Sequence, residues 1–414
     1  MSDSSEHAAH VPHLCNRGAL EGIRVIDLSR VLAGPLCTQI LADQGADVIK
    51  VEPPDGDETR TLGPAVNADG DAAYFTAVNR GKRSIAVDLS LACGREALLA
   101  LLEDADVLIE NFLPGTMARW GLDYETGLRP RFPQLIYCAI SGFGEDGPLG
   151  GLPGYDAILQ AMCGLMSVNG APAGGPTRIG IPIVDHLTGY TALSGILLAL
   201  YHRARTGRGQ RVEATLFDTA LSLLVPHAAN WMHTQSVPGL LGSAHPNIAP
   251  YDRYPCRDGE VFLGIVNDRQ FRKFCGYIGQ PALSDDERYA TNRQRLLHRD
   301  ALRAAIEAAL HAREREAVCR DLMQLGVPAG PVNSIPEAFE HAHTTHRGMR
   351  IERGGYHGIG APIRLSEAPA RPGRPPPAYA QHTDEVLREA GLDDTRIAAL
   401  NEQGALPRRP PRKP

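Results

Sequence analysis

The stretch "IRVIDLSRVLAGPLCTQILADQGADVIKVE", residues 23–52, decides the fold. It begins with one β-branched run, "IRVIDLS", and ends with a second, "DVIKVE". Between these runs, Cys37–Gln44 has a helical pattern of apolar residues. A strand, a helix and a strand in this order form a βαβ unit, whose strands lie parallel in one sheet. The stretch therefore predicts an α/β fold with a mostly parallel sheet.

The same alternation continues over the first half of the chain and then stops. Its further members are the runs "SIAVDL", "DVLIENF", "LIYCAISGF" and "GRGQRVEATLF" and the helical stretch Gly94–Asp104. After Pro226 the sequence is rich in Gly, Pro and His, and Glu260–Val332 is typical of one strand followed by helices. We predict a disordered tail (1–18), a first large-domain part (19–225), a linker and small domain (226–335), a return linker and second large-domain part (336–402), and a disordered basic tail (403–414).

Composition excludes several classes of protein. The 414 residues carry a formal net charge of -6, without a charged block except the basic C-terminal residues, so we expect no nucleic-acid or membrane partner. The eight cysteines are scattered, and we predict no metal site. The start does not resemble a signal peptide, and the apolar run "LSGILLALY" is too short to cross a bilayer. We expect a cytoplasmic protein.

The segment "GFGEDG", residues 142–147, matches the spacing of a dinucleotide-binding loop. Such a loop needs a following helix whose N-terminus faces a pyrophosphate. Here Pro148 and further glycines follow, and Glu145 and Asp146 would repel phosphate. We interpret the segment as a tight loop at the end of a strand.

Asp185 is the most informative single carboxylate. It follows the apolar pair Ile183 and Val184, which we interpret as the end of a strand, and it precedes a long helical pattern. One interpretation is a helix N-cap, for which Asp is favoured. The other is chemistry, because ligands bind at the carboxyl ends of strands in open α/β sheets. With an ordinary pKa of about 3.9 the group would be ionised at neutral pH and nucleophilic without a general base.

Five ordered segments resemble the class III coenzyme A transferases, relatives of formyl-CoA:oxalate CoA-transferase and of carnitine CoA-transferase. They run from "LEGIRVIDLSRVLAGP" through "YFTAVNRGKRSIAVDL", "DVLIENFLPGTMARWG" and "GLPGYDAILQAMCGLM" to "VDHLTGYTALSGILLALYHRARTGRGQ". The match covers about residues 20–218. The resemblance implies a Rossmann-like large domain built from both chain ends, a smaller α+β domain and an interlocked homodimer. It also implies that an acyl-CoA thioester is a substrate and that no cofactor is tightly bound.

The resemblance further implies roles for individual residues. Asp185 matches the catalytic aspartate, which forms an anhydride with the donor acyl group and then an aspartyl-CoA thioester. The N–H groups at the start of its helix would stabilise the developing oxyanions. Residues expected to bind CoA are Val31, Ala33, Lys82, Arg83, Asn111, Phe112, Arg119 and Trp120. Residues expected near the acid are Leu32, where formyl-CoA:oxalate transferases have a glutamine, and His245, Asn247 and Tyr251.

The acceptor acid and two other functions stay open. Residues 154–170 and 181–190 resemble members that use succinyl-CoA and C4–C6 dicarboxylates. One alternative is an isomerase like α-methylacyl-CoA racemase, whose motif has a histidine where Tyr155 stands here, so that one of its two bases would be missing. The other alternative is a CoA-binding protein without turnover, which an activity assay would separate from the transferase.

Overall fold

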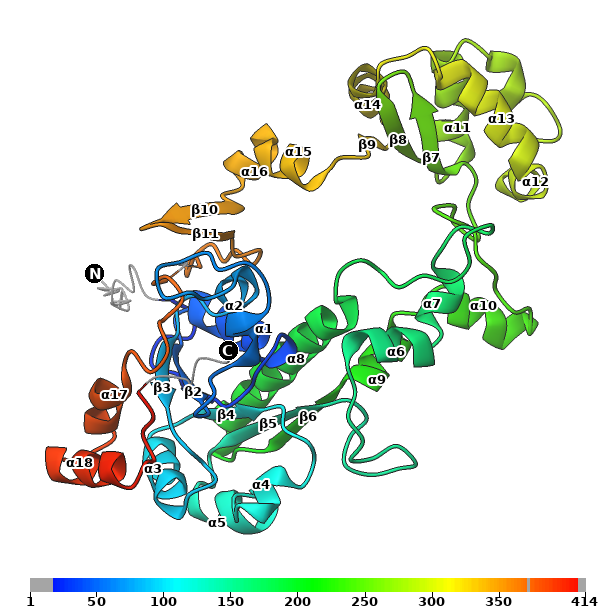
Figure 1. Ribbon diagram of the computed structural model, residues 1–414. Coiled ribbons are helices and arrows are strands. Elements are labelled where there is room, and N and C mark those ends of the chain that lie inside the picture. The colour runs from blue at the N-terminus through cyan, green and yellow to red at the C-terminus, as the bar shows by residue number, and fades with distance from the viewer. Residues whose placement is uncertain (1–17, 371–372, 409–414) are drawn as a thin grey trace, which may run out of the picture. The chain divides into compact units, whose positions relative to one another are not determined.

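The computed structural model describes residues 18–370 and 373–408, and these form two compact units (Figure 1). Unit 1 contains the described parts of Met1–Leu159, Pro182–Ala220 and His346–Pro414, and unit 2 contains Gln160–Ile181 and Leu221–Thr345. Residues 160–181 therefore belong to unit 2, although we had placed them in the large domain. The predicted tail at residues 1–18 lies outside the described residues except for Gly18.

Unit 1 contains a six-stranded sheet in which every neighbouring pair of strands is parallel. The order is β3-β2-β1-β4-β5-β6, which is the order of a doubly wound nucleotide-binding fold. The strands are β1 Arg24–Asp27, β2 Asp47–Glu52, β3 Arg83–Ala86, β4 Val107–Glu110, β5 Ile136–Ser141 and β6 Arg211–Thr215. The predicted α/β class and parallel sheet are confirmed, because all six β-branched runs form strands of this sheet.

Helices cover both faces of the sheet, in agreement with the burial of nearly every residue along β1 to β5. The helices that connect or follow the strands of this sheet are α1 Ala33–Asp43, η1 Glu58–Thr61, α2 Ala73–Ala77, α3 Ala92–Leu102, α4 Thr116–Arg119, η2 Tyr124–Leu128, α5 Arg129–Arg131, α6 Asp156–Met162, α8 Ile183–Thr206 and α9 Leu216–Ser222. Helix α8 packs against α1 and against strands β5 and β6. Its apolar composition and length would also suffice to cross a membrane, a criterion that core helices of soluble proteins meet as well.

The C-terminal part of the chain completes the core on the other face of the sheet. It contributes β10 Arg350–Arg353, β11 Tyr356–Ile359, α17 Thr383–Glu389 and α18 Asp394–Glu402, after α16 Ala342–His346. Val386 and Leu400 join the same buried cluster as Ile26 and Leu98. We had predicted disorder from residue 403 onward, and the structure differs. Ala405 and Leu406 are buried in this cluster because their apolar side chains fit under the sheet, and only residues 409–414 of that tail lie outside the described part.

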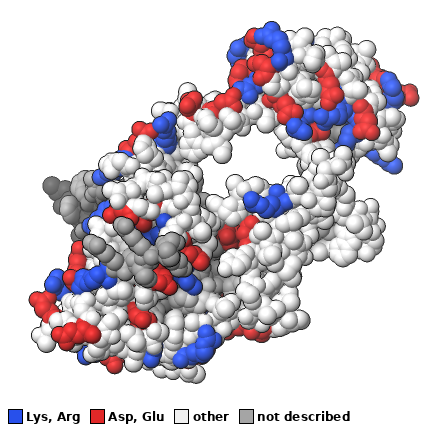
Figure 2. Space-filling view, viewed as in Figure 1, with Lys and Arg blue, Asp and Glu red and all other residues white. Residues whose placement is uncertain are grey.

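Unit 2 has its own core around a three-stranded antiparallel sheet with the order β7-β8-β9. Its strands are β7 Tyr251–Cys256, β8 Gly259–Gly264 and β9 Ala329–Pro331, and its helices are α7 Leu165–Val168, α10 His227–Thr234, α11 Asp268–Tyr277, η3 Pro281–Ser284, α12 Asn292–Leu297, α13 Arg299–Leu310, α14 Arg315–Gln324 and α15 Ile335–Glu340. We had predicted only one strand in this region, which corresponds to β8. The other two were missed because Pro255 in β7 and the Gly-Pro pair in β9 interrupt their apolar pattern. Figure 2 shows basic and acidic side chains mixed over the visible surface of this unit.

Candidate active site

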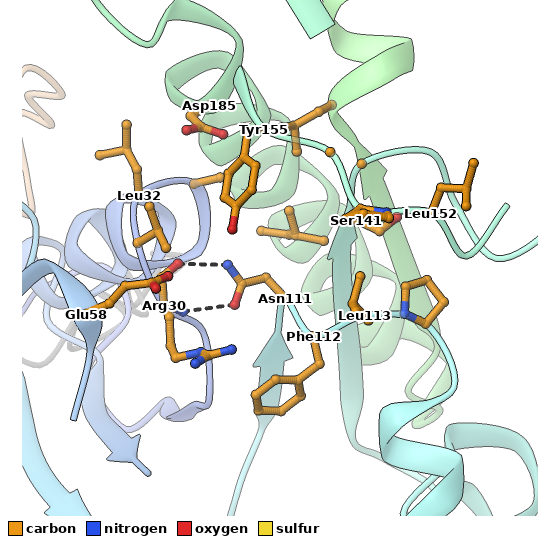
Figure 3. Close-up of a pocket in the computed structure, with 18 residues that line it drawn as sticks. Arg30, Leu32, Glu58, Asn111, Phe112, Leu113, Ser141, Leu152, Tyr155 and Asp185 are labelled. Carbon is orange, nitrogen blue, oxygen red and sulfur yellow. Dashed lines mark hydrogen bonds between the residues drawn. The ribbon is translucent and has the colours of Figure 1, made fainter. Parts of the chain in front are cut away.

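A pocket of about 280 Å³ lies in unit 1 at the carboxyl ends of the central strands. One wall is the loop after β1 that leads into α1, and the facing wall is the segment after β4 (Figure 3). Strands β1 and β4 are neighbours whose following connections run to opposite sides of the sheet, so the pocket lies at the point where the strand order reverses. Open α/β sheets bind their ligands at this position.

Asp185 lines this pocket from the first turn of α8. The helix begins at Ile183 after the N-cap residue Pro182, so Asp185 is the third helical residue and not the cap. The predicted strand end at Ile183 and Val184 is therefore wrong, because both residues already have helical backbone. A close packing of helices positions the carboxylate: a Cβ atom on Gly189 would lie 2.7 Å from the carbonyl oxygen of Ala33. Glycine thus lets α8 approach the start of α1, one turn from Asp185.

Asp156 provides the missing cap of α8. Its buried carboxylate oxygen Oδ1 accepts hydrogen bonds from the backbone N–H of Val184 at 2.8 Å and of Asp185 at 3.3 Å. Burial and the neighbouring charge of Asp156 raise the pKa of Asp185 to about 7. The sequence had suggested an ordinary pKa, since one-dimensional spacing gave no sign that these two carboxylates meet. A carboxylate of this basicity is a stronger nucleophile than an ordinary aspartate and is about half ionised at neutral pH.

This pKa predicts the acid limb of the pH–rate profile. In the mechanism that the resemblance implies, only the ionised form of Asp185 can attack, so kcat/KM for the acyl-CoA should rise with pH and level off above a midpoint near 7. Asp156→Asn keeps an oxygen for the N–H of Val184 but removes the charge, so the midpoint should move to lower pH. Steady-state rates between pH 5 and 9 measure the shift.

One other group needs to be separated from Asp185 in this profile. Burial raises the pKa of Glu110 to about 7 as well, but its carboxylate accepts hydrogen bonds from Phe112 N–H and the Tyr137 hydroxyl, away from Asp156. Tyr74 does not interfere, because burial and the charge of Asp185 raise its pKa above the ordinary tyrosine value, outside the measured range. An acid limb that stays in place in Asp156→Asn would show that a group other than Asp185 controls the rate.

The loop after β1 brings several expected CoA and acid residues into the same pocket as Asp185. Val31, Leu32 and Ala33 all line it, together with Asn111 and Phe112 from the segment after β4. The amide of Asn111 accepts from Arg30 N–H at 2.9 Å and donates to the Arg30 carbonyl oxygen at 2.7 Å (Figure 3). These five residues are far apart in sequence from Asp185 and meet because their strands are neighbours.

An aromatic pair continues from the pocket wall. The rings of Phe112 and Trp120 meet edge to face with centroids 5.4 Å apart, and both pack against the core of unit 1. The guanidinium of Arg30 lies 5.8 Å from the ring centroid of Phe112 and lines the pocket. Arg119 is exposed on α4 and donates to the Thr116 hydroxyl. Trp120 and Arg119 stand beyond the pocket itself, and their contact with CoA stays a prediction.

Lys82 and Arg83 lie elsewhere. Lys82 is completely buried, where its ammonium pairs with Asp27 at 3.0 Å and donates to Asn79 and to the Pro35 carbonyl oxygen. The basic pair "KR" suggested a phosphate site, but a fully buried ammonium with these three partners offers no surface to a phosphate. The guanidinium of Arg83 is held by three carboxylates, those of Asp47, Glu385 and Glu389. The structure therefore does not support phosphate binding by either residue.

The remaining acid-pocket candidates belong to unit 2. There His245 and Tyr251 meet edge to face with ring centroids 5.2 Å apart, and the side chain of Asn247 pairs with that of Asn230. Their role at the acid stays a prediction. Among the described residues, no group of three or more His, Cys, Asp or Glu side chains could hold a metal ion.

Four ionisable residues at the site were missed from the sequence. Arg30, Glu58 and Tyr155 line the pocket, and Asp156 lies behind Asp185. Figure 3 shows Tyr155 next to Asp185, with its hydroxyl directed into the pocket toward Asn111. The dipeptide Tyr155-Asp156 belongs to one of the five motifs, but the motif indicated only that Tyr155 replaces the histidine of a racemase. No sequence signal shows that η1 presents Glu58 to the same cavity.

Comparison with known proteins decides the family. Residues 20–383 match CoA-transferase family III. The chain belongs to this family. It is 44% identical over 381 residues to a succinate–glutarate CoA-transferase of Agrobacterium fabrum, covering 89% of the chain and 95% of the relative. The protein is therefore a class III CoA-transferase that acts on acyl-CoA and carboxylate substrates.

Other relatives of this CoA-transferase agree with the assignment. An acetyl-CoA:oxalate CoA-transferase of Acetobacter aceti is 41% identical over 365 residues, covering 87% of the chain and 93% of the relative. A crystal structure of a CAIB/BAIF family protein from Brucella suis superposes with a TM-score of 0.82 at 42% identity, covering 91% of the chain and all of that protein. The fold of the CoA-transferase is thus that of a solved relative.

Proposed function

We propose that this CoA-transferase moves CoA from succinyl-CoA to a dicarboxylic acid such as glutarate, with Asp185 as the covalent carrier. The observation that carries the proposal is the carboxylate of Asp185, whose pKa is raised to about 7 and which lines a pocket where the strand order of the sheet reverses. The similarity to a succinate–glutarate CoA-transferase supports the choice of donor and acceptor.

The transfer takes four steps at Asp185. A carboxylate oxygen attacks the thioester carbonyl of succinyl-CoA and the C–S bond breaks. The products are CoA thiolate and a succinyl–aspartyl anhydride. The thiolate attacks the aspartyl carbonyl, releasing succinate and leaving an aspartyl-CoA thioester. The acceptor carboxylate then attacks this thioester, giving a second anhydride and thiolate. Attack of the thiolate on the acceptor's carbonyl yields the new acyl-CoA and restores Asp185, with no net proton transfer.

The oxyanions of these steps need hydrogen-bond donors other than those expected. The N–H groups of Val184 and Asp185 are bonded to Asp156, and His186 N–H is bonded to the Pro182 carbonyl oxygen. These three N–H groups of α8 are therefore not free to form the oxyanion site that we had expected. The start of α1 is the better candidate, because Ala33 is its first residue and lines the pocket.

The acceptor specificity can be tested with the unmodified enzyme. The protein is incubated with succinyl-CoA and one acid at a time, namely glutarate, oxalate or acetate, and new acyl-CoA esters are measured by mass spectrometry. Formation of glutaryl-CoA with little acetyl-CoA supports the proposal. Transfer to oxalate alone would reject a C4–C6 dicarboxylate as the acceptor, and hydrolysis of succinyl-CoA without transfer would reject the function. A racemase would instead exchange the α-proton of a methyl-branched acyl-CoA.

The transferase is further proposed to be a homodimer. Leu197, Leu198 and Tyr201 on α8 are 41%, 69% and 65% exposed, which is unusual for large apolar side chains clustered on one helix. A second copy of the chain that covers this face accounts for the exposure without a membrane. A monomeric mass in sedimentation velocity at micromolar concentration, or recovery with lipid vesicles in flotation, would contradict this assignment.

A further inference from the structure

The loop between β1 and α1 comprises residues 28–32, and its three central residues, Ser29–Val31, are fixed by side chains from outside it. The ammonium of Lys50 on β2 donates to the Ser29 carbonyl oxygen at 2.8 Å. The amide of Asn111 bonds both backbone polar groups of Arg30. The carboxylate of Asp57 accepts from Val31 N–H at 3.4 Å and pairs with Lys50 at 2.9 Å, where both side chains are completely buried. Each of the three central residues is thus held through its backbone.

Val31 explains why such a short loop needs so many partners. Its φ angle is +70°, in the left-handed region that a β-branched side chain strongly disfavours. Such a conformation persists only where the surrounding structure enforces it, and it is frequent at functional sites. Val31 and the next two residues line the pocket with Asp185, so a loop that relaxed would move this wall.

Asn111 makes the most geometrically specific contact with this loop. Its two hydrogen bonds to Arg30 reproduce the pairing of two backbone segments and fix both the position and the rotation of that peptide. Figure 3 shows both bonds directed across the pocket floor, from the segment after β4 to the loop after β1. The side-chain oxygen of Asn111 and one of its N–H groups therefore bond to the protein and not to the nucleotide part of CoA.

We propose that Asn111 is a positioning residue for the transfer reaction, which clamps Arg30 so that the strained Val31 and the following Leu32 stay in the pocket wall beside Asp185. The proposal rests on the proposed transfer activity and replaces the nucleotide contact that the family resemblance had implied for the Asn111 side chain. It predicts that loss of the amide harms the reaction geometry more than substrate binding.

The first test separates kcat from KM. Asn111→Ala removes both bonds, and Asn111→Asp keeps the acceptor for Arg30 N–H but sets a second oxygen against the Arg30 carbonyl. Both variants should lower kcat roughly tenfold to a hundredfold, as a displacement of reacting groups by about 1 Å does, while KM for succinyl-CoA changes less than about threefold. A large rise in KM at nearly unchanged kcat would show a direct CoA contact and overturn the proposal.

The second test asks whether strain at Val31 is what Asn111 restrains. Glycine adopts a φ of +70° without a steric penalty, so Val31→Gly removes the strain but leaves the loop in place. The loss caused by Asn111→Ala should then be clearly smaller in the Val31→Gly background than in the wild-type background. Equal losses in both backgrounds would overturn the link between the clamp and the strained residue.

A third measurement does not depend on activity. Hydrogen exchange of ligand-free protein, followed in peptides that cover residues 29–36, should be faster in Asn111→Ala because the N–H of Arg30 loses its acceptor. Asn401→Ala, an asparagine of unit 1 on α18, is the matched control and should leave this exchange unchanged. Unchanged exchange in Asn111→Ala would overturn the clamp, whereas changed exchange in a protein without transferase activity would reject only the proposed function.

Discussion

Replacing Asp185 by asparagine is expected to lower kcat/KM for CoA transfer by about 10⁴-fold or more, the scale of losing a covalent nucleophile. The amide has nearly the same shape as the carboxylate, so α8 and the cap from Asp156 should be kept. What is lost is the oxygen that attacks the thioester. The direct measurement is the mass of the protein after mixing with succinyl-CoA and quenching with hydroxylamine, which converts an aspartyl anhydride or thioester to a hydroxamate.

Two comparisons make this result decisive. The wild-type protein should carry the hydroxamate on the peptide that contains Asp185, and neither Asp185→Asn nor Asp185→Ala should carry it. Asp156→Asn should still form the adduct, because this variant changes only the charge beside the nucleophile. A modified peptide elsewhere in the chain, or full turnover of Asp185→Ala, would show that Asp185 does not carry the acyl group.

Replacing Asp27 by alanine is expected to cost about 3–5 kcal/mol of stability, the range for breaking a buried ion pair from one side. Asp27 is completely buried, where it accepts from Thr38 at 2.6 Å and pairs with Lys82, which is also completely buried. Burial would by itself raise the pKa of Asp27, but Lys82 and Lys50 together with hydroxyl donors lower it. Removal of the carboxylate leaves the buried ammonium of Lys82 without its ion-pair partner and exposed to the charge of Lys50.

The measurement uses the two tryptophans of the chain, of which Trp120 is in unit 1 and Trp231 is in unit 2. In a Trp231→Phe background, urea unfolding followed by fluorescence reports on unit 1, and the midpoint should fall strongly in Asp27→Ala. Glu125→Gln is the control, because its ion pair with Arg129 is exposed to solvent and contributes little to stability. A shift no larger than that of the control would contradict the expected role of Asp27.

The pH dependence of this loss has a defined sign. Burial already lowers the pKa of Lys82 to about 8, although Asp27 acts in the opposite direction. Without Asp27 the pKa of Lys82 falls further, so the unfolded variant binds a proton that the folded variant lacks, and its stability rises with pH. The difference in stability between Asp27→Ala and the wild type should therefore narrow as the pH is raised toward 8.

The sheet could be predicted because its signal is local, and the place of Asp185 at the pocket could be predicted because a motif carries it. The role of Asp185 as the nucleophile stays a prediction. Apolar runs in a parallel sheet are buried on both faces, so β1 to β6 stand out in the sequence. Asp185 and the Val31–Ala33 loop were identified through the family resemblance, and the structure brings them into one pocket.

The rest depends on contacts that sequence spacing does not encode. Asp156 and Asp185 are 29 positions apart, and their meeting raises a pKa that no pattern predicts. Lys82 has the composition of a phosphate ligand, but it precedes a strand that is buried on both faces, so its charge is used inside the protein. Asn111 belongs to a motif associated with CoA, yet only the structure shows that its amide faces the backbone of Arg30.

The burial of Ala405 and Leu406 has a consequence for the synthesis of the chain. The backbone N–H of Asp88, directly after the strands of the first hundred residues, is bonded to the carbonyl oxygen of Ala405. The core that these strands share with α17 and α18 therefore stays open until residues 405 and 406 leave the ribosome. Unit 2 is encoded mainly between these parts and can fold earlier, because its contacts are closer in sequence. The half-built sheet, with its apolar face exposed, is then the state most prone to aggregation.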